Sequence, residues 1–224
     1  MIPWKLLDSA QVPDGSAQMC LYARGGEYSI RVNGCELMNS RVHGSEDAMA
    51  EFACARIGSR PSPRILIGGL GMGFTTAVAL QRLDGEGRVL VAELVPKVVE
   101  WNLKFLGELN GHPLKDPRVT VQETDVSLIL KSENQAFDAI LLDVDNGPAG
   151  LTRTGNNWLY GEAGAKAAFA ALKPAGVLAV WSAGPDPAFA RRLRRVGFQV
   201  EEFGVRARGP AGGSLHTIWI AVRS

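Results

Sequence analysis

The sequence is poor in the residues that build disulfide frameworks and zinc sites. It contains only three cysteines, Cys20, Cys35 and Cys54, and no two of them have the Cys-x-x-Cys spacing. Its three histidines are scattered along the chain. An odd number of isolated cysteines favours reduced thiols over disulfides or a metal centre. We therefore expect a cytoplasmic protein that binds no metal.

Long hydrophobic runs are also missing. No segment reaches the roughly 18 consecutive apolar residues that a membrane-spanning helix needs, and the first residues, MIPWKLLDSAQ, lack a basic stretch followed by an apolar one. We therefore expect no signal peptide and no membrane association. The 224 residues, 46% of them hydrophobic, are enough for one α/β domain with a small appendage.

The sequence has no excess charge of either sign. Lys and Arg number 24 and Asp and Glu 23, so the net charge is +1, and no global field attracts nucleic acid. Four arginines do cluster in residues 191–195. No aromatic residues that could stack on bases alternate with them, so a solvated helix face is the better interpretation than an RNA-binding surface.

Residues 1–60 are predicted to form a small N-terminal β region and a linking helix. Gln18–Arg24 and Glu27–Val32 flank Gly25-Gly26 and predict a hairpin, and a short strand follows the Asn33-Gly34 turn. A helix is expected over Ser45–Ile57, with Ser45 as its N-cap. These strands are candidate material for a homodimer contact.

Residues 61–224 alternate between strand and helix patterns and predict a Rossmann-like domain. Expected strands cover 65–67, 89–94, 119–123, 139–143 and 177–181, and expected helices cover 74–83, 96–109, 127–131, 161–172 and 187–196. The last two strands, 198–205 and 216–222, are joined by a loop alone, so they form an antiparallel hairpin. The predicted fold class is α/β, with a seven-stranded methyltransferase-type sheet.

The stretch ILIGGLGMGF, residues 65–74, is the most informative motif. Ligands of such sheets bind beyond the carboxyl ends of the strands, and Gly69, Gly71 and Gly73 would let main-chain N–H groups approach a ligand there. Glu93 ends the second strand, where a carboxylate can accept hydrogen bonds from a ribose diol. A tight turn without a ligand and an exposed strand-end carboxylate are the alternatives.

The spacing of these glycines disfavours NAD. The dinucleotide fingerprint Gly-x-Gly-x-x-Gly, counted from Gly69, requires glycine where Phe74 stands. The Gly-x-Gly-x-Gly form suits a ligand with one nucleoside and no pyrophosphate.

Further acidic residues follow the third and fourth strands. Asp125 could accept a hydrogen bond from the exocyclic amine of adenine, and Asp143 and Asp145 lie two residues apart in LLDVDNGP. Neighbouring carboxylates raise each other's proton affinity, so one of the pair could act as a base towards an amine. Alternatively, the two could hold a cationic substrate or belong to a turn built on Asn146-Gly147-Pro148.

These motifs, in this order, resemble class I AdoMet-dependent methyltransferases. Within that superfamily the chain is most similar to spermidine synthases, the aminopropyltransferases. The likeness includes NGCELMNSRVHGSE, DPRVTVQETD, FDAILLDVDNGPAGL and ALKPAGVLAVWS.

The resemblance implies roles for several residues. Gly69, Gly71 and Gly73 would face the nucleoside and its tail, Glu93 would hold the ribose and Asp125 the adenine. Asp143 would be the catalytic aspartate that orients and deprotonates the attacking amine.

Three further residues are candidates for substrate binding. His43, and with it Glu46, lies where the linking segment of the family approaches its substrate, with capping and packing as the alternative. Asp145 lies in the acidic loop. Tyr160 would be a lid over the site or an anchor for its loop.

Two departures from the family pattern concern charge. The synthases read Gly-Gly-Gly-Asp-Gly-Gly where this chain has Gly68-Gly69-Leu70-Gly71-Met72-Gly73, so Gly71 replaces the aspartate that grips the aminopropyl end. That loss removes a contact of about 1.5–3 kcal/mol. The family's Asp-Ser-Ser-Asp-Pro becomes Asp143-Val144-Asp145-Asn146-Gly147.

We therefore expect an AdoMet-type transferase that uses AdoMet or decarboxylated AdoMet and alkylates an amine-like small molecule. Because Gly71 replaces that aspartate, we expect methyl transfer slightly more than aminopropyl transfer. A polyamine aminopropyltransferase and a non-catalytic nucleoside-binding or dimerising member of the fold are the alternatives.

Overall fold

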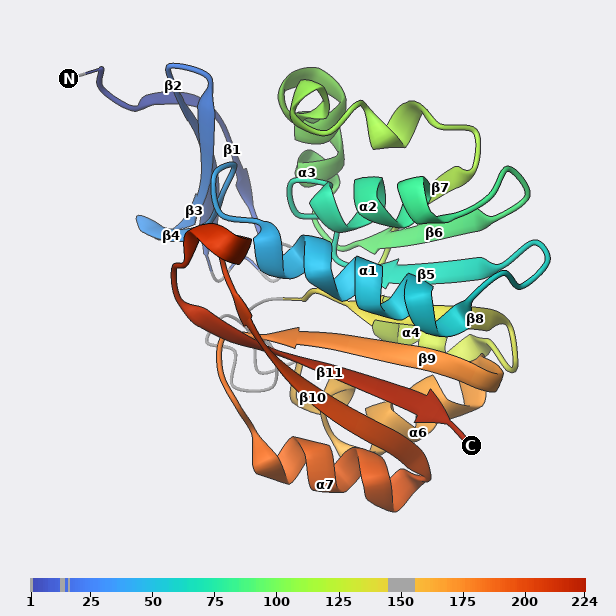
Figure 1. Ribbon diagram of the computed structural model, residues 1–224. Helices are drawn as coiled ribbons and strands as arrows, with labels where there is room; N and C mark the ends of the chain where they lie inside the picture. Colours follow the sequence, from blue (N-terminus) through green and yellow to red (C-terminus); the bar gives the residue numbers. More distant parts are fainter. Residues whose placement is uncertain (1, 13–14, 16, 145–155) are drawn as a thin grey trace.

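The computed structural model describes residues 2–12, 15, 17–144 and 156–224, which form two sheets and the helices around them (Figure 1). The small N-terminal sheet is antiparallel, in the order β1-β2-β3-β4. Its strands are β1 (Lys5–Gln11), β2 (Gln18–Arg24), β3 (Glu27–Val32) and β4 (Cys35–Asn39).

The two predicted turns of this sheet are confirmed. Arg24 pairs with Glu27 across Gly25-Gly26, and Val32 pairs with Cys35 across Asn33-Gly34. All four turn residues have positive φ, as two-residue hairpin loops of the mirror-image type require. The sequence analysis missed β1, an edge strand whose residues are all exposed or half-buried and show no clear alternation.

The large sheet has seven strands in the order β10-β11-β9-β8-β5-β6-β7. The strands are β5 (Arg64–Gly68), β6 (Arg88–Glu93), β7 (Val119–Glu123), β8 (Phe137–Leu142), β9 (Leu172–Ser182), β10 (Phe198–Arg206) and β11 (Leu215–Arg223). Strands β5 to β9 pair in parallel, whereas β11 is antiparallel to both β9 and β10. The predicted fold class, including the C-terminal hairpin, is confirmed.

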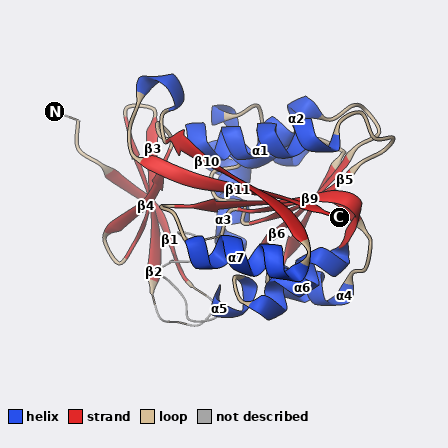
Figure 2. Ribbon diagram, turned by 60° about the horizontal axis from the view of Figure 1, so that its bottom comes forward, coloured by secondary structure: helices blue, strands red, loops and turns tan. Residues whose placement is uncertain are grey.

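Helices cover both faces of the large sheet (Figure 2). One face carries α1 (Gly44–Ile57), α2 (Phe74–Arg82) and α3 (Pro96–Trp101), and the other carries α4 (Val126–Ser132), α5 (Asn156–Leu159), α6 (Glu162–Ala171) and α7 (Pro187–Val196). None of the helices within the described ranges is long and apolar enough to cross a membrane.

Helix α1 joins the two sheets. The predicted division of the chain after residue 60 follows the order of the elements, but in space α1 lies beside α2 against the large sheet (Figure 1). Its residues Met49, Ala50 and Ala53 are fully buried there. The predicted cap is wrong, because His43 is the N-cap residue and no side chain caps the helix. The Ser45 hydroxyl instead contacts side chains at the end of the large sheet, described below.

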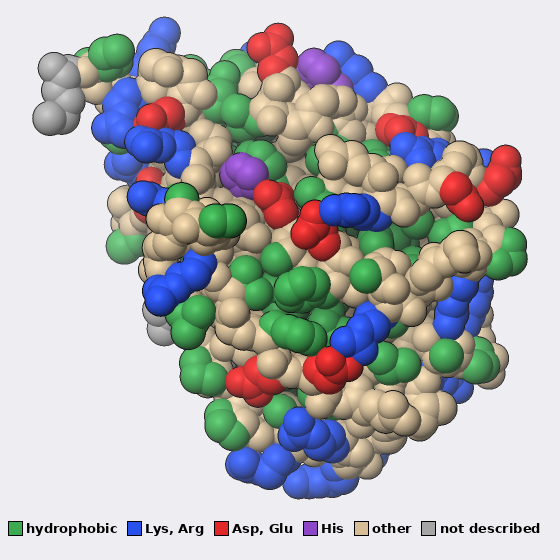
Figure 3. All heavy atoms as spheres, viewed as in Figure 1, with side chains coloured by type: hydrophobic (Ala, Val, Ile, Leu, Met, Phe, Trp, Pro, Cys, Tyr) green, Lys and Arg blue, Asp and Glu red, His purple; other side chains and the backbone are tan. Residues whose placement is uncertain are grey.

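The basic helix α7 lies at one end of the molecule, where Lys and Arg side chains gather at the bottom of the view in Figure 3. Two of its arginines bind main-chain carbonyls: Arg192 donates to Tyr160 O and Arg194 to Val200 O. The expectation that this face is solvated and binds no RNA stays a prediction.

A buried carboxylate ties the start of the large sheet together. Asp138 on β8 accepts hydrogen bonds from Arg60 Nη1 at 3.0 Å, Arg64 N at 2.8 Å and Lys173 Nζ at 2.7 Å, and its side chain is 4% exposed. Burial alone would raise the pKa of Asp138, but the bonds from Lys173, Arg64 and Arg60 outweigh burial and lower it.

We predict that Asp138→Asn lowers the free energy of unfolding at pH 7 by roughly 2–3 kcal/mol, because charged donors lose their charged acceptor. The pKa of Asp138 is lower in the folded protein than the value of about 3.9 expected in the unfolded chain. The ionised carboxylate therefore stabilises the folded state at pH values above about 3.9, and this stabilisation is lost as the pH falls through the folded-state pKa. Urea unfolding should therefore show a difference that shrinks below about pH 4. Glu108→Gln, an exchange at an exposed carboxylate, is the control. An undiminished difference in acid would contradict this account.

Candidate functional site

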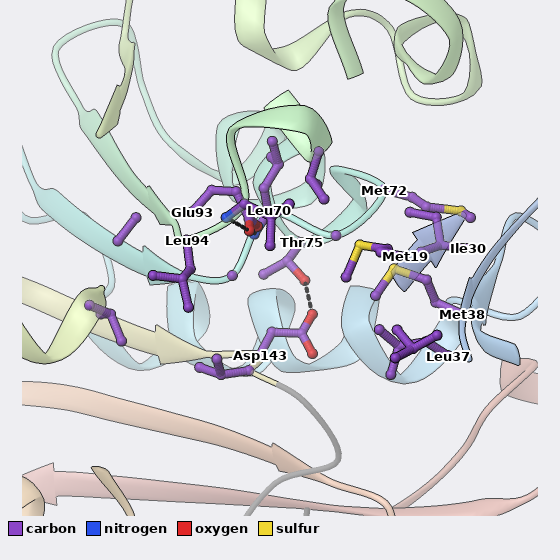
Figure 4. Close-up of a pocket in the computed structure, with 18 of the residues that line it drawn as sticks. Met19, Ile30, Leu37, Met38, Leu70, Met72, Thr75, Glu93, Leu94 and Asp143 are labelled. Carbon is purple, nitrogen blue, oxygen red and sulfur yellow. Dashed lines mark hydrogen bonds between the residues drawn. The ribbon is translucent and has the colours of Figure 1, made fainter. Parts of the chain in front are cut away.

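A cavity lies beyond the carboxyl ends of β5, β6 and β8, and the N-terminal sheet forms its opposite wall (Figure 4). Five of the expected site residues, Gly69, Gly71, Glu93, Asp125 and Asp143, line this cavity. The structure thus brings together residues from four separate strand ends. Asp145 and the expected turn at 146–148 lie outside the described residues.

The glycine loop runs from the end of β5 into α2, and two of its glycines lie close to neighbouring parts of the chain. Gly69 has a φ of 89°, and a Cβ there would lie 2.3 Å from the carbonyl oxygen of Asp143. Gly71 has a φ of 53°, and a Cβ there would lie 3.3 Å from Met38 Sδ. The loop therefore presses against the end of β8 on one side and against the N-terminal sheet on the other.

Gly73 is placed differently from the other two glycines. It is buried, it is not among the residues that line the cavity, and a Cβ on it would meet Asn102 Oδ1 at 2.9 Å and Asn110 Nδ2 at 3.0 Å. The structure thus gives Gly73 a packing role behind the loop, at the N-terminus of α2.

Two asparagines that the sequence analysis did not single out brace this loop from behind. The Nδ2 group of Asn102 donates to Gly71 O at 2.9 Å, and that of Asn110 donates to Met72 O at 2.7 Å. They follow α3, which was predicted to continue to Leu109. Instead, the chain changes at Asn102 into a π-helical segment and then into a 3-10 turn over 107–109. Short π segments of this kind are frequent at functional sites.

Glu93 is buried, so an exposed strand-end carboxylate is the wrong interpretation. Its side chain accepts hydrogen bonds from Leu70 N at 2.8 Å and Val95 N at 2.9 Å, and the residue is 7% exposed. Burial raises the pKa of Glu93, while these main-chain N–H groups oppose the rise. Glu93 thus shapes the glycine loop from the cavity wall, and its contact with a ribose stays a prediction.

Asp125 caps the helix that follows β7. Its Oδ1 accepts a hydrogen bond from Ser127 N at 2.8 Å, and the residue also lines the cavity, just beyond β7, the strand that pairs with the β6 strand of Glu93. A side chain held in this way is fixed before any ligand arrives. Its contact with adenine also stays a prediction.

Asp143 stands in the middle of the cavity, and Thr75 Oγ1 from α2 donates to its Oδ2 at 3.1 Å (Figure 4). Burial, followed by the negative charge of Glu46, raises the pKa of Asp143 to about 7, which the bond from Thr75 opposes. Its carboxylate therefore gains and loses a proton close to neutral pH, as a base for an amine must.

Glu46 on α1 is a second carboxylate in the wall of the cavity. Burial raises the pKa of Glu46 as well. The resemblance places Glu46, like His43, where the linking segment approaches the substrate, with capping and packing as the alternative, and of the two only Glu46 lines the cavity. Two carboxylates that raise each other's proton affinity form a ready binding place for a cation, which would relieve their repulsion.

A hydroxyl at the start of α1 holds Glu46 in place. Ser45 Oγ donates to Glu46 Oε2 at 2.7 Å and accepts from Trp181 Nε1 at 3.0 Å, and it also lies 2.9 Å from His216 Nδ1. The main chain is fixed too, since Gly44 N donates to Ala207 O at 2.8 Å. The C-terminal hairpin and β9 thus position a carboxylate that belongs to the N-terminal part of the chain.

His43 and Tyr160 do not line the cavity. The ring of His43 stacks on Phe74 at 3.9 Å and bonds to Asp47, whose carboxylate raises the pKa of His43. Tyr160 is buried, and its hydroxyl donates to Val144 O at 2.9 Å. The position of His43 fits the interpretation that its ring serves in packing. The position of Tyr160 fits an anchor for its loop better than a lid over the site.

A family model for the spermine/spermidine synthase domain matches residues 56–186, which is more than half of the chain. No curated protein matches the sequence.

Among solved structures, a spermidine synthase from Thermotoga maritima is similar with a TM-score of 0.77 at 18% identity, over 98% of this chain and 73% of that one. A spermidine synthase in complex with the transition state analogue AdoDATO gives a TM-score of 0.79 at 17% identity, over 98% and 74%. A probable spermidine synthase from Corynebacterium glutamicum gives 0.68 at 14%, over 98% and 80%. At these identities the structures establish a shared fold.

We predict that Gly69→Ala weakens binding of methylthioadenosine by about ten-fold or more, or roughly 1.4 kcal/mol. The new methyl group collides with the carbonyl of Asp143, and the positive φ strains any residue other than glycine. Titration calorimetry measures the change. Gly85→Ala is the matched control, because nothing lies within 4 Å of the position a Cβ would take there. Equal binding by both variants would contradict the close packing of the loop.

Proposed function

This chain belongs to the spermine/spermidine synthase domain family, which consists of AdoMet-type transferases, and from this premise we propose that it is an aminopropyltransferase. Its donor would be decarboxylated AdoMet, and its acceptor an amine. The observation that carries this proposal is the single cavity in which the glycine loop, Glu93 and Asp125 adjoin the carboxylates of Asp143 and Glu46.

The residues present fit the nucleoside of such a donor. Gly69 and Gly71 leave the main chain bare, and Glu93 and Asp125 stand at the same end of the cavity with their orientation already fixed by main-chain N–H groups. Preorganised acceptors lose little freedom on binding. We propose that Glu93 binds the ribose hydroxyls and Asp125 the adenine amine.

The carboxylate pair supports aminopropyl over methyl transfer. Decarboxylated AdoMet carries an ammonium group at the end of its aminopropyl chain, and Asp143 and Glu46 can stabilise that positive charge. Intact AdoMet adds a carboxylate, which the same pair would repel. Gly71 alone favours the methyl donor, but the family match gives no support to that preference. Glu46 supplies negative charge near the loop that lacks its aspartate.

In the proposed reaction, the lone pair of the acceptor amine attacks the aminopropyl carbon bonded to sulfur. A nitrogen–carbon bond forms as the carbon–sulfur bond breaks, and sulfur retains the bonding electrons, so that neutral methylthioadenosine leaves. Asp143 takes the proton that the amine gives up. Because the sulfonium is already activated, most of the acceleration would come from holding the two reactants in line.

The open cavity also weighs against a non-catalytic member of the fold. Such a protein would need neither a carboxylate with a pKa of about 7 nor a second one beside it, yet this chain keeps both in the wall of one cavity. Groups with strongly shifted pKa values in a cavity are typical of active sites.

We predict that the protein forms methylthioadenosine from decarboxylated AdoMet and a primary amine. Asp143→Asn should lower the rate by about 10²–10⁴-fold, as loss of a general base does, and leave methylthioadenosine binding nearly unchanged. Chromatography of the products and calorimetry measure the two effects. Asp84→Asn, beyond the far end of α2, is the control. Faster consumption of intact AdoMet, with a methylated amine as the product, would reverse the proposal.

A second prediction concerns pH. The value of kcat/KM should rise with pH through about 7 as Asp143 loses its proton. Glu46→Gln removes a negative charge that raises the pKa of Asp143, so this limb should move to lower pH. The pH profiles of both proteins are recorded with the same amine, so protonation of the amine affects the two profiles equally. A limb that stays in place in Glu46→Gln would show that the two carboxylates are not coupled.

A further inference from the structure

We propose that the acceptor is a monoamine with an apolar chain, and not a diamine. This inference rests on the proposed function and adds the chemical class of its second substrate. Its basis is the contrast between the two ends of the cavity, which Figure 4 shows on either side of Thr75 and Asp143.

The end of the cavity away from Glu93 is apolar. Strands β2 and β3 contribute Met19 and Ile30, and β4 contributes Leu37 and Met38; Met72 of the glycine loop lies beside them (Figure 4). Met19 is 8% exposed and Ile30 1%. These side chains together form a continuous hydrocarbon and thioether surface, suited to an alkyl chain or ring.

The one polar side chain that the N-terminal sheet adds to this wall is already engaged. Asn39 donates from Nδ2 to Glu36 Oε1 at 2.8 Å and accepts at Oδ1 from Arg41 N at 3.0 Å. Glu36, which accepts that bond, also accepts from Ser29 Oγ at 2.8 Å and does not line the cavity. Both side chains are therefore already hydrogen-bonded within the N-terminal sheet.

The carboxylates of the cavity all lie elsewhere. Among its described lining residues the acids are Glu46, Asp143, Glu93 and Asp125, and none is a Lys, Arg or His. Asp143 and Glu46 can hold the reacting amine and the aminopropyl ammonium of the donor, while Glu93 and Asp125 stand at the nucleoside end. Among the described residues, the apolar wall offers no carboxylate to a second acceptor charge, and burying a charge without a partner is strongly unfavourable. An acidic acceptor would likewise meet no cation among these residues.

The reacting amine and the apolar chain would thus occupy adjacent places. With its nitrogen beside Asp143, an alkylamine would direct its chain towards Leu37 and Met38. Every methylene placed there leaves water and gains contact with the wall. The site would select its acceptor by the group at the far end of that chain.

Two amines of equal size test this inference. n-Pentylamine and 1,4-diaminobutane both have six non-hydrogen atoms and differ only in a terminal methyl or ammonium group. Each is titrated by calorimetry into the protein saturated with methylthioadenosine, and each is assayed for turnover with decarboxylated AdoMet. We expect n-pentylamine to bind at least about ten-fold more tightly than 1,4-diaminobutane and to have the higher kcat/KM. A ten-fold difference is within the discrimination that apolar pockets achieve.

A second experiment places a negative charge on the apolar wall. Leu37→Glu should reverse the preference towards 1,4-diaminobutane. Leu128→Glu, the same exchange at a position that is 56% exposed on α4, should leave it unchanged. Circular dichroism verifies that both variants are folded; if Leu37→Glu is not, Met38→Glu takes its place.

The outcomes separate the two proposals. Tighter binding of 1,4-diaminobutane by the unaltered protein, or binding of neither amine, would overturn the monoamine inference. If n-pentylamine binds but neither amine yields methylthioadenosine, the inference about the cavity stands and the aminopropyl transfer is wrong.

Discussion

The site depends on the contact between Gly69 and the carbonyl oxygen of Asp143. Strands β5 and β8 are neighbours in the sheet, and Asp143 N donates to Gly68 O at 2.9 Å, so the glycine loop and the expected catalytic residue leave the sheet side by side. Any Cβ at position 69 would occupy the space of that carbonyl. The absence of a side chain at Gly69 therefore lets Asp143 and the glycine loop lie close together. Glu93 holds the same loop from β6, by accepting a hydrogen bond from Leu70 N.

The small N-terminal sheet is the second wall of this site and not a separate appendage. Asp8 on β1 accepts from Trp101 Nε1 at 3.0 Å, which ties the edge of the small sheet to the fully buried end of α3. On the other side, α1 carries Glu46 into the cavity, and Ser45 connects it to Trp181 and His216 at the far end of the chain. Both attachments must hold for the apolar strands to face the carboxylates.

Local patterns were enough to predict the elements that position the nucleoside end. The apolar strand before Gly68, the glycines after it and Glu93 at the end of the next strand are each defined by a few neighbouring residues, and the parallel order of strands then brings them together. The contacts that hold Glu46 in the cavity wall could not be predicted in this way, because they depend on Ser45 meeting His216, 171 positions away. The π segment at Asn102 was equally invisible, since its sequence continues a helical pattern from Pro96. Sequence showed which residue types were present, and packing decided which carboxylate entered the cavity.

Gly71 and the apolar wall are physically linked. A side chain at position 71 would press on Met38, because its Cβ would lie 3.3 Å from Met38 Sδ. The positive φ of 53° adds strain for any residue other than glycine. A carboxylate enters the cavity wall from another element instead: Glu46 on α1, which accepts a hydrogen bond from Ser45 Oγ. Glycine in the loop, methionine on the sheet and glutamate on the helix are thus compatible with both proposals, that the cavity binds a cationic donor and that its other end receives an apolar acceptor.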